Sequence, residues 1–185
     1  MLAPRIDAEG GNYRGLVLMA GTLRKLEEVM AGQTEDALSS MNGLMRRLVG
    51  TQMRKLNRTF DRMYELSDEE AKRKKVGGGT TLYYFKEMGE HAASDYLKSY
   101  HKPIFVMQGG KDFQVKADKD FALYRELLKD KVNAAFKLYP DLNHAFVPSV
   151  YGNITKAKQE YQIEQHIGEE VISDLANWIK TASIG

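Results

Sequence analysis

Two side chains able to do acid–base chemistry each follow a short apolar stretch. Asp112 comes after residues 103–108, a run of strand formers that ends at Gly109-Gly110, and His144 comes after residues 134–139. A carboxylate that accepts a hydrogen bond from one imidazole nitrogen fixes the tautomer and leaves the other nitrogen to act as a general base. The order aspartate before histidine is that of the second and third members of one class of nucleophilic triad.

The segments around these residues predict how the two side chains meet. Residues 103–108 and 134–139 have the composition of buried strands, and apolar side chains at three-to-four spacing between them indicate a helix. These apolar positions are Phe121, Leu123, Tyr124, Leu127 and Leu128. A helix between two strands predicts a βαβ crossover and a parallel sheet. Because the carboxyl ends of parallel strands lie at one edge, about 4.8 Å apart, we expect Asp112 and His144 to come within hydrogen-bonding reach.

Three stretches carry a resemblance to a known family. The sequences GGKDFQV, residues 109–115, and LYPDLNHAF, residues 138–146, are similar to the acid and histidine loops of α/β-hydrolase serine esterases, most of all the dienelactone hydrolase and acyl-peptidase-like group. Residues 168–180 are similar to the last helix of that family. The resemblance implies an acyl-serine mechanism on carboxylic esters, with peptide or thioester bonds as less favoured substrates. It assigns Asp112 and His144 to the triad.

Each candidate residue also has an alternative interpretation. His144 could be a loop histidine that bonds only to backbone, and Asp112 a turn residue after two glycines, where aspartate is common. Asp118, Asp120 and Asp141 are rivals for the acid: the first two are suited to begin the next helix, and the third lies in a Pro-Asp turn. We favour Asp112 because it lies in the first loop turn after its strand.

The nucleophile of such a triad is missing from the 185 residues. In the resembled family it is a serine on a Gly-x-Ser-x-Gly turn between a strand and a helix, and that pattern does not occur here. Residues 2–6 resemble the continuation of the helix that follows this turn. We therefore expect a chain that begins just after the turn, as a fragment, a product of internal initiation or a wrongly assigned start, with little or no activity by itself.

A strand expected at residues 13–20 has a consequence for assembly. In the strand order that the resemblance implies, it would pair with a strand that this chain lacks. An open apolar sheet edge favours self-association. We expect a homodimer or higher oligomer, formed through the exposed edge or by exchange of cap helices.

The resemblance divides the chain into a hydrolase core, residues 1–21 and 80–185, and a helical cap insertion, residues 22–79, which covers the active site in the family. From residue 38 to residue 63, apolar side chains at three-to-four spacing lie opposite a face of arginines and lysines. This pattern predicts one long helix beginning near Thr34, or two nearly collinear helices with a break near Gly50. Residues 67–70 match the capping box of a shorter helix, which the glycines at 77–79 are expected to end.

Together these elements predict the fold class. It is α/β, a partial α/β-hydrolase fold of about three parallel strands flanked by helices, with a helical cap insertion. The last helix is expected to bury one face, formed by Val171, Ile172, Leu175, Trp178 and Ile179.

A non-catalytic interaction module is the alternative function. The long basic amphipathic pattern within residues 22–79 could bind a partner helix, an anionic membrane surface or nucleic acid. The same segment carries enough acidic residues to make its net charge modest, so we expect neither nucleic acid nor a membrane as a partner. The basic run at 72–75 is interpreted as the solvated end of a helix rather than as a phosphate site.

Composition narrows the remaining possibilities. The chain is 43% hydrophobic, enough for a core, and its formal net charge of +2 gives no strong field that would select a polyanion. Cysteine is absent, which excludes disulfides and thiolate metal sites and favours a cytoplasmic location. His91, His101 and His166 lack metal-ligand spacing, and residues 77–80 lack the Gly-Lys-Ser/Thr ending of a phosphate-binding loop. We therefore expect no metal and no cofactor.

Overall fold

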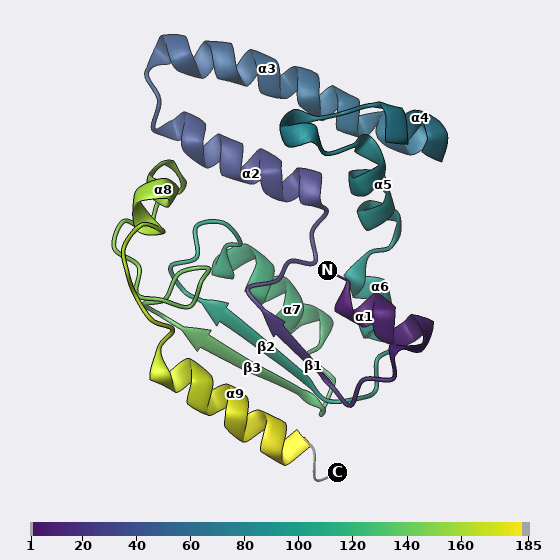
Figure 1. Ribbon diagram of the computed structural model, residues 1–185, viewed down its shortest axis with the longest axis vertical. Coiled ribbons are helices and arrows are strands. Elements are labelled where there is room, and N and C mark those ends of the chain that lie inside the picture. The colour runs from purple at the N-terminus through teal and green to yellow at the C-terminus, as the bar shows by residue number, and fades with distance from the viewer. Residues whose placement is uncertain (1, 183–185) are drawn as a thin grey trace. The chain divides into compact units, whose positions relative to one another are not determined.

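Three parallel strands form the sheet that carries the two candidate loops (Figure 1). In the computed structural model, which describes residues 2–182, the strands are β1 (Leu16–Met19), β2 (Ile104–Gly109) and β3 (Ala134–Tyr139), in the order β1-β2-β3. Leu16 is paired with Ile104, and Ile104 with Ala134. The predicted α/β class, with a parallel sheet and flanking helices, is confirmed.

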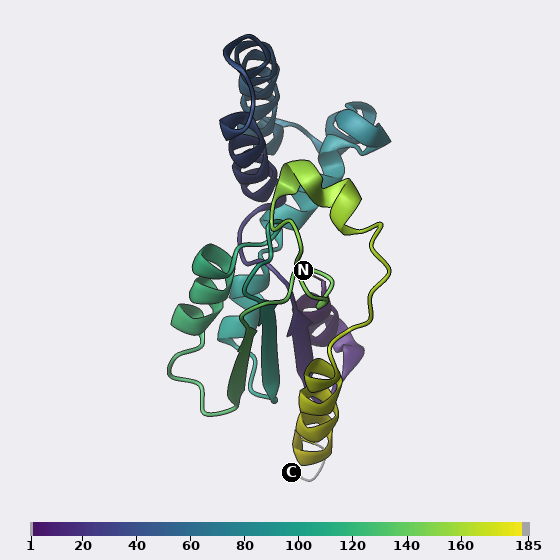
Figure 2. The ribbon, with the colours of Figure 1, turned by 90° about the vertical axis from the view of Figure 1, so that its left-hand side faces the viewer.

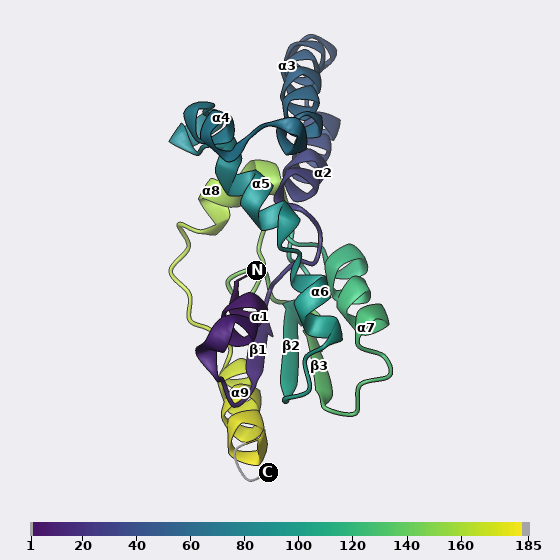
Figure 3. The ribbon, with the colours of Figure 1, turned by 90° about the vertical axis from the view of Figure 1, so that its right-hand side faces the viewer.

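Helices cover both faces of this sheet (Figures 2 and 3). α6 (Ala93–Lys98) and α7 (Ala122–Leu127) lie on one side, and α9 (Glu169–Ala182) lies on the other. A helical turn at Ala117–Phe121 leads into α7. The remaining elements of this part are α1 (Ala3–Ile6), a turn at Asp7–Gly11, a 3-10 turn at Ile154–Lys156 and the short α8 (Ala157–Glu160).

Side-chain alternation along the strands supplies a core on each face. Ile104 and Val106 pack with Tyr124 on the side of α6 and α7. Phe105 points to the other side and stacks on Trp178, with 5.6 Å between the ring centroids. β2 lies between the other two strands and all of its residues are buried. This position explains why its sequence is apolar up to Gln108.

The buried face of α9 is narrower than predicted. Val171 is 1% exposed, and Leu175 and Trp178 pack against the same core, as expected. Ile172 and Ile179, predicted to share this face, are 57% and 48% exposed. The stripe at 171, 175 and 178 follows the helical repeat and meets the sheet, whereas positions 172 and 179 lie about 100° further round the helix.

The edge of the sheet at β1 is incompletely covered. Within residues 2–182, β1 hydrogen-bonds to β2 alone, and Met19 at its end is 39% exposed. Beside β1 lies a cavity of about 370 Å³ whose lining includes Tyr13, Val17, Trp178 and Ile179. Among the described residues, β1 therefore has one unpaired edge next to apolar side chains.

Residues 24–92 form a second compact unit, separate from the unit made by residues 1–23 and 93–185. Its helices are α2 (Leu26–Ser39), α3 (Gly43–Asp61), α4 (Asp68–Arg73) and α5 (Leu82–Glu90), with 3-10 turns at Met63–Glu65 and Gly77–Gly79. Phe60, Met63, Leu82 and Phe85 form its core, and the rings of Phe60 and Phe85 lie 4.9 Å apart. The unit takes in α5, which lies outside the predicted insertion of residues 22–79; the role of that insertion as a cap stays a prediction.

Most of the long helical pattern is one helix, α3, which packs side by side with α2 (Figure 1). The predicted start near Thr34 and the alternative of a break near Gly50 are wrong. The chain turns after Ser39, and the side chain of Asn42 caps α3 by accepting a hydrogen bond from the Met45 N–H at 3.0 Å. Gly50 lies inside α3, where glycine costs only about 1 kcal/mol. Thr34 lies inside α2 and donates its hydroxyl to the Met30 carbonyl instead of starting a helix.

The predicted capping box at the start of α4 is confirmed. Ser67 Oγ accepts from the Glu70 N–H at 3.4 Å, and Glu70 Oε2 accepts from the Ser67 N–H at 3.0 Å. The predicted helix end at residues 77–79 is wrong, because α4 stops at Arg73 and Lys74 is already extended. A backbone bridge between Lys75 and Thr81 closes the following turn and accounts for the early end.

Candidate active site

Asp112 and His144 are in direct contact at the carboxyl ends of β2 and β3. His144 Nδ1 lies 2.8 Å from Asp112 Oδ2. Because an ionised carboxylate can only accept, Nδ1 carries the proton and the lone pair of Nε2 points elsewhere. The Asp112 side chain is fully buried and that of His144 is 35% exposed. The pair therefore has a sheltered acid and an imidazole that a reactant can reach.

Further hydrogen bonds fix the orientation of the Asp112 carboxylate. Oδ1 accepts from the backbone N–H groups of Gln114 and Val115, at 2.8 and 2.9 Å. Oδ2 accepts from Gln108 Nε2 at 2.8 Å, in addition to His144. Each oxygen thus accepts two hydrogen bonds, which together keep the carboxylate from rotating away from the imidazole.

Gln108 is a positioning residue that the sequence analysis missed. It ends the apolar part of β2 and is 1% exposed, with its amide nitrogen shared between Asp112 Oδ2 and the Val115 carbonyl. The sequence contains a sign of this role, because a glutamine in an otherwise apolar strand becomes buried and then requires a polar partner. Its side chain connects the end of the strand to the turn that presents Asp112.

Two glycines allow the acid and histidine loops to touch. A β-carbon on Gly110 would lie 2.7 Å from the Pro140 carbonyl oxygen, and one on Gly109 would press into the backbone of Leu142. In place of side chains, hydrogen bonds join the loops: the Gly110 N–H donates to the Tyr139 carbonyl at 2.7 Å, and the Lys111 N–H to that of Leu142 at 2.9 Å. Close backbone approach is what only glycine permits here.

A buried carboxylate anchors the loop that carries His144. Glu160, 1% exposed, accepts from Asn143 Nδ2 at 3.0 Å and from Ser149 Oγ at 2.9 Å. It also accepts from the backbone N–H groups of Val150 and Tyr151, the latter at 2.7 Å. Asn143, itself fully buried, accepts from the Ala145 N–H at 2.9 Å. Glu160 therefore fixes the residue before His144, although it lies 17 positions after Asn143.

The ionisation of Glu160 follows from these contacts. Burial raises the pKa of its carboxyl, but the hydrogen bonds from Tyr151, Asn143, Ser149 and Val150 together outweigh burial and bring the pKa below its ordinary value of 4.5. The group is therefore an anion at neutral pH. Sequence patterns give no sign of this role, because it depends on contacts between separate turns.

The rival carboxylates have other partners. Asp120 is fully buried and accepts from the Thr22 hydroxyl at 2.6 Å, at the start of the helical turn that leads into α7. Asp141 is exposed and pairs with Lys111 at 2.8 Å. Asp118 lines a cavity of about 550 Å³ beside Asp112. The geometry thus brings Asp112, and none of the three rivals, to His144.

The two phenylalanines beside the candidate residues belong to the interior. Phe146 is 3% exposed, packs edge-on against Tyr139, and has a φ of +58°, a conformation that a bulky residue seldom adopts. Phe113 is 6% exposed and lies 5.8 Å from the ring of Tyr161. A tightly packed neighbour on each side limits the movement of both loops.

Two classes of site find no support in the described residues. Between residues 2 and 182, no three histidine or acidic side chains gather closely enough to hold a metal ion. Over the same range, no helix has both the length and the apolar character needed to cross a bilayer.

Comparison with known proteins gives the geometry a family context. The dienelactone hydrolase family model matches residues 66–182. Esterase EstD of Thermotoga maritima is 27% identical over 179 residues, which make up 97% of this chain and 40% of that protein. The structure of an esterase of Pyrococcus furiosus aligns over 97% of this chain and 49% of its own, with 13% identity and a TM-score of 0.48. The chain spans less than half the length of either relative.

The matched residues include both candidate loops. They run from the end of the second unit through β2, Asp112, β3 and His144 to α9. This match covers more than half of the 185 residues. The chain belongs to the dienelactone hydrolase family.

Proposed function

We propose that this chain supplies the acid and the base of a serine hydrolase that cleaves carboxylic esters. The observation that carries the proposal is the hydrogen bond between His144 Nδ1 and the buried carboxylate of Asp112, in a chain of the dienelactone hydrolase family. The name of Esterase EstD, a relative, supports an ester as the substrate class.

In this mechanism the exposed nitrogen of His144 does the proton transfers. Nε2 takes the proton from a serine hydroxyl as that oxygen attacks the ester carbonyl, and returns it to the departing alkoxide. Asp112 keeps the imidazole in the required tautomer and stabilises the imidazolium that forms between these steps. Water then repeats the sequence on the acyl-serine, with His144 again as the base.

The serine itself comes from outside the 185 residues in this proposal. No Gly-x-Ser-x-Gly sequence occurs in them. Ser149, the serine that follows the histidine loop, donates its hydroxyl to Glu160 at 2.9 Å. A triad without its nucleophile and oxyanion donors loses most of its rate, so we expect the chain by itself to be nearly inactive.

The experiment compares the chain alone with a chimera that joins it to the Gly-x-Ser-x-Gly segment of an active family member. We expect no reaction of the chain with a fluorophosphonate probe and no hydrolysis of a nitrophenyl ester. The chimera should do both, with the label on the added serine. Stoichiometric labelling of a serine within the 185 residues would refute the placement of the nucleophile.

We further propose that the chain self-associates. The open edge of β1, the exposed Met19 and the apolar cavity beside Trp178 together form a surface that a second copy can cover. Light scattering at micromolar concentration should report a dimer or larger species. Replacing the half-exposed Ile179 by lysine should shift it toward the monomer, and a monodisperse wild-type monomer would contradict this proposal.

A further inference from the structure

A cavity in the second unit has a strongly basic lining and contains no residue of the candidate triad. Its volume is about 550 Å³, and it lies between the end of α3, the turn after it, and the start of α5. We call it the basic basin and define it by its charged residues and its apolar floor: Lys55, Arg58, Arg62, Glu65, Lys74 and Leu82.

The helical repeat gathers most of these cations. Lys55, Arg58 and Arg62 are spaced three and four residues apart, which places them on one face over the last turns of α3 and its C-cap. Lys74 adds the fourth cation; it is the extended residue after α4 and the one member of the basic run 72–75 that lines the cavity. Leu82 is 1% exposed and forms part of the floor.

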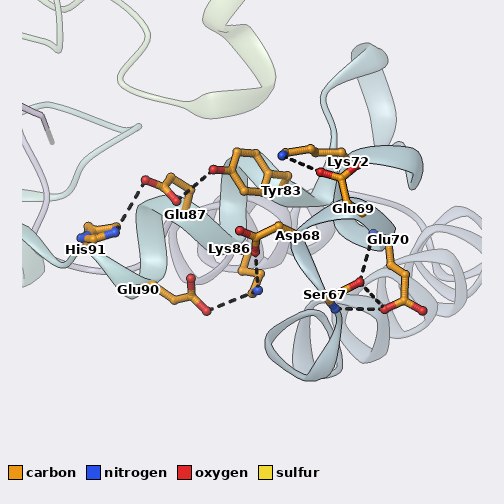
Figure 4. A network of polar contacts seen from close by, with 10 residues as sticks. All are labelled: Ser67, Asp68, Glu69, Glu70, Lys72, Tyr83, Lys86, Glu87, Glu90 and His91. Carbon is orange, nitrogen blue, oxygen red and sulfur yellow. Dashed lines mark hydrogen bonds and ion pairs between the residues drawn. The ribbon is translucent and has the colours of Figure 1, made fainter.

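Two other lysines of this unit, Lys72 and Lys86, are neutralised by acids (Figure 4). Lys72 Nζ lies 3.0 Å from Glu69 Oε1, and Lys86 Nζ lies 2.7 Å from Asp68 Oδ1. Glu90 lies 3.7 Å from the same ammonium group. These three acidic residues of α4 and α5 therefore pair with Lys72 and Lys86, as Figure 4 shows.

The cations of the basin have no such partners. In the part of the chain that the structure describes, no side-chain hydrogen bond or ion pair joins Lys55, Arg58, Arg62 or Lys74 to a carboxylate. Hydrogen bonds from Ser67 are the main cause of the lowered pKa of Glu70, and the charge of Lys74 lowers that pKa by less. One carboxylate, that of Glu65, lines the cavity together with the four cations.

The helix dipole does not explain this arrangement. The end of α3 carries the equivalent of about half a negative charge, which suits one or two nearby cations. Four cations around one cavity repel one another, and this repulsion costs stability unless an anion enters. Two arginines within one helical turn also offer planar forks of donors that match phosphate oxygens.

We propose that the basic basin binds the phosphate group of a soluble phosphorylated small molecule. The arginines take the phosphate oxygens, and the lysines neutralise the remaining charge. Glu65, the one acidic residue of the lining, accepts a hydrogen bond from a hydroxyl of the ligand. The volume lies within the range of about 300–1,000 Å³ that small-molecule sites occupy. This proposal does not depend on the proposed esterase function.

The test uses pyrophosphate and inorganic phosphate as probes, with binding followed by calorimetry on the 185-residue chain. We expect one site per chain and tighter binding of pyrophosphate. A double variant with Arg58→Gln and Arg62→Gln should bind pyrophosphate at least about tenfold more weakly, because each arginine makes charge-assisted hydrogen bonds. The matched control carries Arg47→Gln and Arg73→Gln, the same charge change on α3 and α4 outside the basin.

The outcomes separate this site from a general charge effect and from a membrane. Weakening by the basin variant alone supports the proposal, provided that both variants keep the circular dichroism and melting temperature of the wild type. Equal weakening by both variants, or no binding of pyrophosphate at millimolar concentration, would overturn it. Binding to vesicles that contain phosphatidic acid, without binding of soluble pyrophosphate, would also overturn it in favour of a lipid headgroup.

Discussion

Replacing His144 by alanine in the active chimera should lower kcat for a nitrophenyl ester by about 10⁴-fold, because the serine loses its general base. Asp112→Asn should cost a similar factor, since the amide no longer enforces the tautomer with the proton on Nδ1. KM should change little in both variants, because neither side chain is proposed to hold the substrate in its ground state.

The matched control for this result is Asp141→Asn. Asp141 lies on the histidine loop, was a rival for the acid, and is exposed in a pair with Lys111. Its loss should change kcat by less than about twofold, since an exposed ion pair contributes little. If Asp141→Asn lowered kcat as much as Asp112→Asn, the assignment of the acid would be wrong.

Glu160→Ala should destabilise the protein by about 3 kcal/mol, because it leaves the buried amide of Asn143 and the part-buried N–H groups of Val150 and Tyr151 without their acceptor. Urea unfolding of the 185-residue chain measures this change. Glu164→Ala is the control: Glu164 lies in the same connection, is exposed, and should change the free energy of unfolding by less than about 0.5 kcal/mol.

The same residue gives a pH dependence with a definite sign. The pKa of Glu160 is lowered below 4.5 in the folded protein, so its contribution to stability is complete above that value and disappears as the pH falls through the folded pKa. In the variant Glu160→Gln this contribution is absent, so the difference from wild type should be constant near neutral pH and should shrink as the pH falls from about 5 to about 3. An unchanged difference across that range would mean that the charge of Glu160 has no part in anchoring the loop.

The sequence alone predicts that Asp112 and His144 meet, because local sequence patterns define the strands and turns that carry both residues. Strand runs, glycine breaks and a helix between them determine a parallel pair, and parallel strands bring their carboxyl ends together. Gln108 and Glu160 were missed for the opposite reason. A polar residue in an apolar strand shows that Gln108 needs a partner, but not that the partners are Asp112 and Val115. The partners of Glu160 come from separate turns, which the sequence does not show to lie close together.

The errors in the helices have a similar physical origin. Gly50 suggested a break, but its helix penalty of about 1 kcal/mol is small beside the packing of a long amphipathic face. The actual turn depends on Asn42, a cap whose effect appears only when the next helix begins there. Ile172 and Ile179 were predicted to be buried because they are apolar, but both are exposed. Hydrophobic composition alone does not determine which part of a helix meets the sheet.

The anchor at Glu160 divides the connection between His144 and α9 into two stretches that should tolerate change very differently. Residues 145–160 have to keep their length, because Ser149 and Tyr151 must reach the same carboxylate. Residues 162–167 are mostly exposed and come after that constraint. Lengthening a loop costs only about 0.6 kcal/mol per doubling, so natural insertions and deletions, or an engineered epitope tag, belong in this second stretch.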